Sequence, residues 1–268
     1  MMPLTSPLRC GHASVEREGH KLLCRSCLSF HEAAARGNSP YVASYPRERG
    51  HFDVDIMALK VRTLERWMKL LKIDLRSKAV CEVGFGGGGC LQYIRRSART
   101  YLGIEVIRQN LEHAKGMGLE RVIDFERLPN HLEPKIDLWI FQDSFEHIKT
   151  PGPFLDWLSR NSSPAALLMM VLPRADCFSE KLMGKCWIHR TPDHDFHWSL
   201  AGVSVFLNGF GFNLARSFAP QKYLSLYTIF SHVFCLCRKT PIPIGRKTSK
   251  RMSFLFNMGE MGLLFQKG

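Results

Sequence analysis

A glycine-rich turn over residues 84–89 stands between a short apolar run and a helical pattern. Glycines are required where the backbone takes positive φ, or where a ligand must lie against it without an intervening Cβ. Glu105 ends the next apolar run, 21 residues after Gly84, and a carboxylate at such a position can accept two hydrogen bonds from a ribose diol. These residues predict a site for a nucleoside-containing cofactor.

The spacing of the glycines is compatible with two classes of cofactor. Gly84, Gly86 and Gly89 satisfy the G-x-G-x-x-G fingerprint of dinucleotide binding, which keeps a dehydrogenase as an alternative. Glu82, however, places a carboxylate just before the glycines, where it would repel a pyrophosphate and attract a cationic amino-acid group. The turn also comes after about eighty residues instead of at the start of the chain. Both features favour a cofactor that carries an amino-acid moiety.

Candidate acid–base residues follow a later apolar run, over residues 136–141. His147 lies shortly after this run, close in sequence to Asp143 and Glu146, and histidine is the commonest general base near neutral pH. We expect His147 to take a proton from an acceptor hydroxyl, and Asp143 to position the cofactor or the substrate. The alternative is that Glu146 and His147 only cap or hold in place the helix expected to begin near Pro151.

A second cluster of protonatable side chains occupies residues 191–199. His194 is its candidate for catalysis. Asp193, Asp195 and His197 lie beside it, but the four carry no recognised ligand spacing, so a metal is not expected here. Large aromatic residues around the cluster predict either an apolar wall for a ring-bearing or lipid-like acceptor or plain aromatic core. They are Trp187, Phe196 and Trp198.

Cysteine and histidine near the N-terminus suggest a structural metal site. Cys24 and Cys27 form a C-x-x-C pair, and thirteen residues separate Cys24 from Cys10, with His12 two positions after Cys10. A closed zinc site needs four such ligands from two short knuckles. Metal binding would supply the folding energy that so short a segment lacks. The first knuckle has one intervening residue instead of two to four, so unligated cysteines are the alternative. Possible substitute ligands are His20 and His31.

The elements that must position these residues alternate along the chain. A helix is predicted over 54–71, because its apolar residues recur every three or four positions. Short apolar runs then alternate with helical patterns, which is typical of a doubly wound, mostly parallel α/β sheet whose strands present ligands at their carboxyl ends. Strands are expected over 79–83, 101–105, 122–125, 136–141, 166–171, 212–216 and 261–265. Further helices are expected over 91–98, 109–115, 153–160 and 199–208.

Residues 79–217 resemble the class I S-adenosylmethionine-dependent methyltransferases, in particular the branch similar to the ubiquinone-biosynthesis O-methyltransferases. Residues 82–88 stand as the family's cofactor loop, residues 101–105 as its ribose-binding strand, and residues 143–151 are similar to the branch's D-x-x-E-H-x-x-x-P signature. The resemblance implies a seven-stranded Rossmann-like fold and S-adenosylmethionine as cofactor. It assigns cofactor contacts to Glu82, Gly84, Phe85, Gly86, Gly88, Glu105, Asp124, Phe125 and Asp143, with Asp124 and Phe125 flanking the adenine.

The sequence departs from the family pattern within the loop. Four consecutive glycines, residues 86–89, replace a more usual mixture and would raise the ordering cost of cofactor binding. Phe85 fills a position often held by a small residue. Several methyltransferases that this chain resembles carry a cysteine knuckle pair before the catalytic domain, which implies that the N-terminal segment could cover the substrate.

Composition and charge set the remaining expectations. Residues 1–38 are expected to form the zinc-binding module, 39–53 a linker, and 54–268 the methyltransferase domain. Nine scattered cysteines favour a reducing compartment, with the cytoplasm as default. No signal peptide or membrane-spanning run is recognised. The net charge of +13 suits an anionic partner, which could be a substrate, a lipid or a nucleic acid.

The apolar segment 222–238 is expected to be a buried helix, with peripheral membrane contact as the alternative, because cations flank it. The leading function is methyl transfer to a small or lipid-linked acceptor, at oxygen. The alternatives are a nucleic-acid methyltransferase, although no N-P-P-Y-type motif supports it, and a non-catalytic methyltransferase-like scaffold that no longer holds cofactor.

Overall fold

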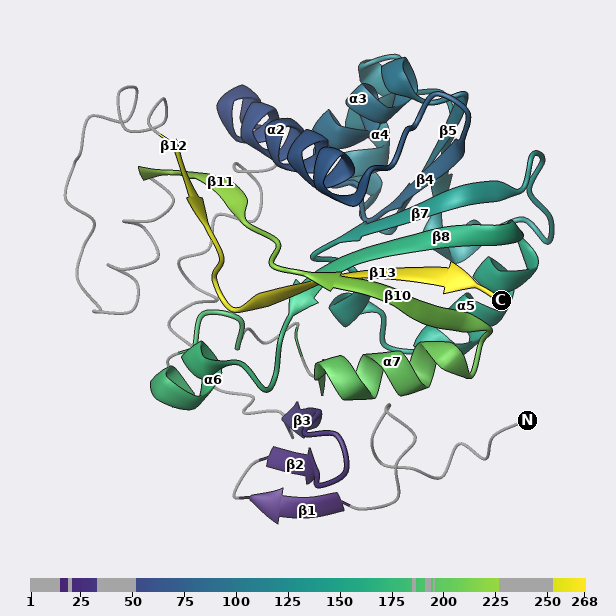
Figure 1. Cartoon of the computed structure of the whole chain (residues 1–268). Helices are drawn as coiled ribbons and strands as arrows, with labels where there is room; N and C mark the ends of the chain where they lie inside the picture. Colours follow the sequence, from purple (N-terminus) through teal and green to yellow (C-terminus); the bar gives the residue numbers. More distant parts are fainter. Residues whose placement is uncertain are drawn as a thin grey trace.

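A seven-stranded sheet forms the centre of the molecule (Figure 1). The computed structural model describes residues 15–18, 21–32, 52–184, 187–190, 194, 196–226 and 253–268. The sheet has the order β10-β13-β8-β7-β4-β5-β6, and β13 runs antiparallel to both of its neighbours. Its strands are β4 (Ala79–Val83), β5 (Thr100–Glu105), β6 (Val122–Asp124), β7 (Ile136–Gln142), β8 (Ser162–Pro173), β10 (Phe212–Phe218) and β13 (Glu260–Lys267).

Helices cover both faces of this sheet (Figure 1). Helices α2 (Val54–Leu71) and α3 (Gly89–Ser97) pack on one face, where Trp67 and Ile94 meet Leu138 and Ile140. Helices α5 (Pro151–Arg160) and α7 (Leu200–Asn208) pack on the other. A third cluster joins α4 (Arg108–Gly116) to the glycine turn. The predicted doubly wound sheet is therefore confirmed.

The predicted elements follow from burial on both faces. In β7, Leu138 and Ile140 point to one helix layer, whereas Trp139 and Phe141 point to the other, so the whole run must be apolar. Helix α2 begins where the Asp53 carboxylate accepts hydrogen bonds from two backbone N–H groups, and ends at Lys72 in the left-handed region, with φ 56°.

Three short strands near the N-terminus form a second sheet. They are β1 (Val15–Glu18), β2 (Lys21–Cys24) and β3 (Phe30–Glu32), and β3 pairs with β9 (Phe196–His197) of the main domain. Figure 1 places this sheet beside α7. Cys24 and Cys27 are buried in the same core cluster as α5 and α7. Cys10 and His12, the other expected zinc ligands, lie outside the described residues.

The C-terminal region differs from the expectation at its start. Residues 222–225 are not helical: they form β11 (Lys222–Ser225), which pairs with β12 (Ser253–Phe256). The rest of segment 222–238 beyond Leu226 lies outside the described residues. The remaining short elements are the 3₁₀ turns η1 (Phe125–Arg127) and η2 (Phe145–His147), and α6 (Phe178–Met183). Among the helices that the structure describes, none is long and apolar enough to cross a bilayer.

Candidate functional site

The glycine turn lies where the strand order reverses, between β4 and its neighbours β5 and β7. Gly84 has φ +75°, and a Cβ at this position would lie 2.5 Å from the Cβ of Ser144. The Ser144 hydroxyl donates to the carbonyl of Val83 at 2.7 Å. The turn after β4 therefore contacts the segment after β7 directly, which joins the two predicted halves of the site.

Glu82 is buried beside this turn, and its carboxyl group is only partly hydrogen-bonded. One carboxylate oxygen accepts a hydrogen bond from the Gln142 amide at 3.3 Å, and the other has no hydrogen-bond partner among the described residues. Burial raises the pKa of Glu82 to about 8, against the opposing charge of Lys60. An unpartnered buried acceptor at this position suits a cationic ligand group.

Glu105 at the end of β5 is fully engaged within the protein. Its carboxylate accepts hydrogen bonds from the backbone N–H groups of Gly86, Val106 and Ile107 and from the Asn110 amide, at 2.8–3.2 Å. A carboxylate offers about four lone pairs, so all are used. A ribose diol would have to replace one of these donors, and the Glu105 carboxylate meanwhile holds the glycine turn in place.

The other predicted cofactor residues lie around the same edge. Strand register places Asp124 opposite Glu105, and the Asp124 carboxylate accepts from the backbone N–H of Glu126. Phe125 packs on Phe154, with ring centroids 4.9 Å apart. The side chain of Phe85 is buried in the cluster with α4, so a ligand in the turn could meet only its backbone. Backbone φ is also positive at the two remaining candidates, Gly86 and Gly88.

Asp143 follows β7, at the start of the segment where the acid–base residues were predicted. It has φ +52°, and its carboxylate accepts a hydrogen bond from the Lys222 ammonium at 2.6 Å. Burial acts to raise the pKa of Asp143, but the charge and hydrogen bond of Lys222 outweigh it and lower that pKa. Lys222 also donates to Glu260 at 2.6 Å. Strand β11 thus supplies a cation shared between two carboxylates.

Two histidines that are 47 residues apart in sequence meet beside Asp143. The Nε2 atoms of His147 and His194 are 3.2 Å apart, and His194 Nδ1 lies 2.8 Å from the carbonyl oxygen of His189. Burial lowers the pKa of His189 to about 3, so its imidazole is neutral. Glu146 lies in the same group and is buried, and burial next to Asp143 holds its pKa well above the usual range.

The structure brings the predicted catalytic residues Asp143, His147 and His194 into one cluster. Neither Asp193 nor Asp195 lies within the described residues. The aromatic residues around them are almost completely buried, and Phe196 and Trp198 belong to the main core, as the core interpretation expects. The partners Lys222, Glu260 and His189 were not predicted from the sequence. Their only signal was a charged or protonatable residue next to an apolar run.

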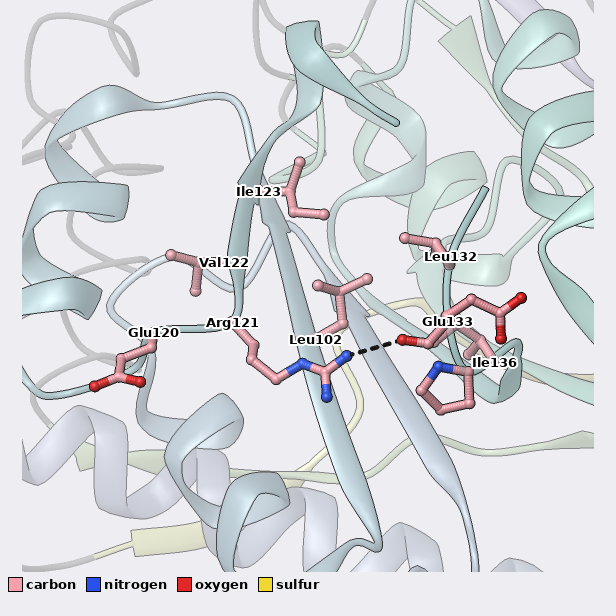
Figure 2. A pocket seen from close by; sticks show the side chains of 9 residues that line it. Leu102, Glu120, Arg121, Val122, Ile123, Leu132, Glu133 and Ile136 are labelled. Carbon is pink, nitrogen blue, oxygen red and sulfur yellow. Dashed lines mark hydrogen bonds between the residues drawn. The ribbon is translucent and has the colours of Figure 1, made fainter. Parts of the chain in front are cut away.

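A cavity lies elsewhere, between β5, β6 and the segment before β7 (Figure 2). Its volume is about 210 Å³, and Figure 2 shows Arg121 reaching across it toward the carbonyl of Glu133. Val122 and Ile136 begin their strands, whereas Asp124 and Asp143 lie at or beyond the opposite ends. This cavity is therefore separate from the candidate site.

Comparison with known proteins gives a family match over most of the folded domain. A model described as a methyltransferase domain matches residues 57–217. A sequence search of curated proteins gave no match.

Several solved structures share the fold. Magnesium protoporphyrin IX methyltransferase from Synechocystis, solved with bound SAH, is 13% identical with a TM-score of 0.51, over 81% of this chain and 86% of that one. The YcgJ protein from Bacillus subtilis is 13% identical with a TM-score of 0.53, over 77% and 98%. An S-adenosylmethionine-dependent methyltransferase from Mesorhizobium loti is 11% identical with a TM-score of 0.51, over 78% and 100%.

Proposed function

The chain belongs to the methyltransferase-domain family, and from this premise we propose that it transfers the methyl group of S-adenosylmethionine to an acceptor hydroxyl. The observation that carries the proposal is the contact between the glycine turn and the Asp143–His147 segment, because it sets a cofactor site beside a proton acceptor. Solved methyltransferases with the same fold, one with SAH bound, support the choice of cofactor.

The cofactor half of the site fits this group. The unpartnered oxygen of Glu82 suits the α-ammonium of the methionine moiety. Gly84 has positive φ and lets the turn pack directly on Ser144. Glu105 and Asp124 lie side by side where the nucleoside would lie. Bound there, the cofactor would supply an activated methyl on a sulfonium. Positioning of the two reactants would then provide most of the reduction in activation free energy, which can reach about 7–11 kcal/mol in favourable cases.

The acceptor half is proposed to remove the hydroxyl proton. A hydrogen bond from His194 Nδ1–H to the carbonyl of His189 would fix the His194 tautomer and leave its Nε2 as an acceptor. His147 would donate its Nε2–H to His194 across their 3.2 Å contact and take the proton of the acceptor hydroxyl at Nδ1. General base catalysis of this kind contributes about 10²–10⁴-fold.

The finer assignment is to the branch similar to the ubiquinone-biosynthesis O-methyltransferases, with a small or lipid-linked acceptor. It is supported by the spacing of Asp143, Glu146, His147 and Pro151, and by the way the fold gathers the first three in one cluster.

We also propose a structural zinc ion at the N-terminal knuckle. Both Cys24 and Cys27 are buried, and they flank a tight turn. The backbone N–H of Leu28 donates to the carbonyl of Cys24, and Leu28 has φ +62°. These contacts present the two sulfur atoms from one turn, as a zinc knuckle requires. The free thiols of Cys81 and Cys90 support the proposal of a reducing, cytoplasmic location.

Calorimetric titration with S-adenosylmethionine tests the proposed function. Wild-type protein should bind with micromolar affinity. Gly84→Ala should weaken binding by at least about tenfold, because a Cβ would strain a positive-φ position and collide with Ser144. Gly116→Ala is the matched control, since a Cβ there meets nothing within 4 Å, and it should bind normally. No binding to wild type at millimolar concentrations would contradict the proposal.

One observation favours a second candidate function, a non-catalytic scaffold. All the acceptor positions of the Glu105 carboxylate are already used by the protein. If that arrangement does not open for a ribose, the chain holds no cofactor. The same titration separates the two functions, because only the enzyme binds S-adenosylmethionine.

A further inference from the structure

One buried carboxylate in the acceptor cluster has no protein partner. Glu146 is 2% exposed, and neither of its carboxylate oxygens has a hydrogen-bond partner among the described residues. Leaving a buried polar group unsatisfied costs roughly 1–3 kcal/mol, and more when it is charged. The protein therefore keeps an unfavourable group at this position, beside the residues proposed to handle the acceptor.

The two histidines complete a set of donor atoms around this carboxylate. One ligand atom from each of Glu146, His147 and His194 lies within 4.8 Å of the others. The 3.2 Å between the two Nε2 atoms is close to the separation of about 3.3 Å that two imidazole nitrogens have on one zinc ion, with bonds of about 2.0–2.1 Å in tetrahedral geometry.

The far side of the His194 ring supports the same interpretation. Its Nδ1 lies 2.8 Å from the carbonyl oxygen of His189, so Nδ1 carries the proton and Nε2 presents its lone pair to the cluster. Metal-ligating histidines almost always donate their other N–H in this way, which fixes the ring orientation. The orientation of His194 is therefore already that of a ligand.

The surrounding charges favour a cation. Three carboxyl groups, those of Asp143, Glu146 and Glu260, lie around the Lys222 ammonium, and Lys60 adds a second positive charge near Asp143. The carboxyl groups still outnumber the cations, which favours an added positive charge.

We propose that Glu146, His147 and His194 bind one divalent transition-metal cation. Two imidazoles and one carboxylate are a donor set for zinc, manganese, iron or cobalt that leaves coordination positions open. No spacing rule finds this set in the sequence, because His194 reaches the other two only in the folded chain. The existence of the site does not depend on the proposed function.

The role of the cation does rest on the proposed function. An acceptor oxygen that coordinates the cation would have a lowered pKa, since bound metals favour the deprotonated form of their ligands. In the loaded site both Nε2 atoms are coordinated, so the hydroxyl proton would pass to solvent. His147 would act as the proton acceptor only in the metal-free protein.

Cobalt titration of the full-length protein tests the site. The protein is first loaded with zinc and then dialysed against a chelator weak enough to leave zinc in the four-ligand knuckle while it strips the open three-ligand site. Co²⁺ is then added while the visible absorption is followed. We expect one Co²⁺ per chain, without the intense near-ultraviolet bands of thiolate ligation. Glu146→Gln and His194→Ala should each weaken binding by at least about tenfold. The matched control is His131→Ala, which removes an exposed histidine and should change nothing.

Three results would overturn the site: no cobalt binding, binding that both variants leave unchanged, or a spectrum of thiolate ligation alone. Thermal melting of each variant checks that it folds. If His194→Ala does not fold, the isosteric Glu146→Gln still tests the site. Titration with S-adenosylmethionine in parallel keeps the two proposals apart. Cofactor binding without cobalt binding overturns the metal site only, whereas cobalt binding without cofactor binding overturns the methyltransferase function only.

Discussion

Two carboxylates at the ends of neighbouring strands are held in opposite ways. Glu105 accepts four hydrogen bonds from the protein, so its charge is stabilised and it fixes the glycine turn. Glu82 is equally buried, yet one of its oxygens has no partner among the described residues. Glu105 therefore stabilises the glycine turn, and Glu82 is the better candidate for direct contact with a cationic ligand.

Substitution of Glu82 by glutamine should change how stability depends on pH. Burial raises the folded-state pKa of Glu82 from 4.5 to about 8, so between these values the folded state keeps a proton that the unfolded state has lost. Wild-type stability should consequently fall as pH rises through this window, by on the order of a few kcal/mol. Glutamine does not titrate, so Glu82→Gln should gain stability relative to wild type between pH 5 and pH 8.

Urea unfolding at the two pH values measures this difference. Glu126→Gln replaces an exposed carboxylate and is the matched control, which should follow the wild-type curve. Parallel pH dependence of wild type and Glu82→Gln would mean that Glu82 titrates as an ordinary carboxylate.

The N-terminal strands pack against the segment that carries His194, the proposed catalytic histidine. Strand β3 pairs with β9, two residues after His194. Phe30 stacks on His197 with ring centroids 4.5 Å apart, and the backbone N–H of Ser199 donates to the Ser29 hydroxyl at 3.0 Å. The N-terminal strands are therefore built into the edge of the proposed acceptor site, and the proposed zinc ion would also hold this segment.

Removing the knuckle thiols should release one zinc ion per chain. The double variant Cys24→Ser, Cys27→Ser lacks two of the expected ligands, and elemental analysis of the purified protein should show the loss together with a lower melting temperature. Cys177→Ser is the control, because serine can still cap α6 at that position and the zinc content should not change. Equal zinc content in the double variant and wild type would refute the knuckle.

At the level of the whole molecule, charge and exposed apolar groups suggest an anionic surface as partner. The net charge is +13. Phe254 and Phe256 of β12 are 48% and 54% exposed, and Figure 1 places β12 at the end of the sheet where β13 begins, which is the end that carries the site. A lipid-linked acceptor could be presented from such a surface.

Co-sedimentation with vesicles tests this partner. We predict binding to anionic vesicles at low salt and little binding to neutral ones, with loss at about 0.5 M salt because the charges are screened. Phe254→Ser with Phe256→Ser should weaken binding several-fold, whereas Val205→Ser on α7, also an exposed apolar residue, should not. Absence of binding at low salt would exclude the membrane contact, and competition by RNA would favour the nucleic-acid alternative.

The sequence predicts the central sheet well, because strands buried on both faces are continuous apolar runs, as in β7 and β8. It also predicts that Glu82, Glu105 and Asp143 share one edge, since parallel strands end together. It does not predict contacts between distant segments. Lys222 reaches Asp143 only through the β11–β12 pairing, and His194 reaches His147 only through the fold. The helix predicted over 222–238 was wrong at residues 222–225, which form β11. An apolar run does not reveal a strand partner about thirty residues away.

Hydrogen exchange with and without SAH tests the central claim, that the carboxyl edge of β4 and β5 binds S-adenosylmethionine. SAH should protect the backbone amides of residues 84–90 and 105–110, because the ligand would lie against the glycine turn and the end of β5. Residues 120–123, which line the cavity in Figure 2, should exchange at the same rate in both states. Protection confined to residues 120–123, or no protection at saturating SAH, would contradict the claim.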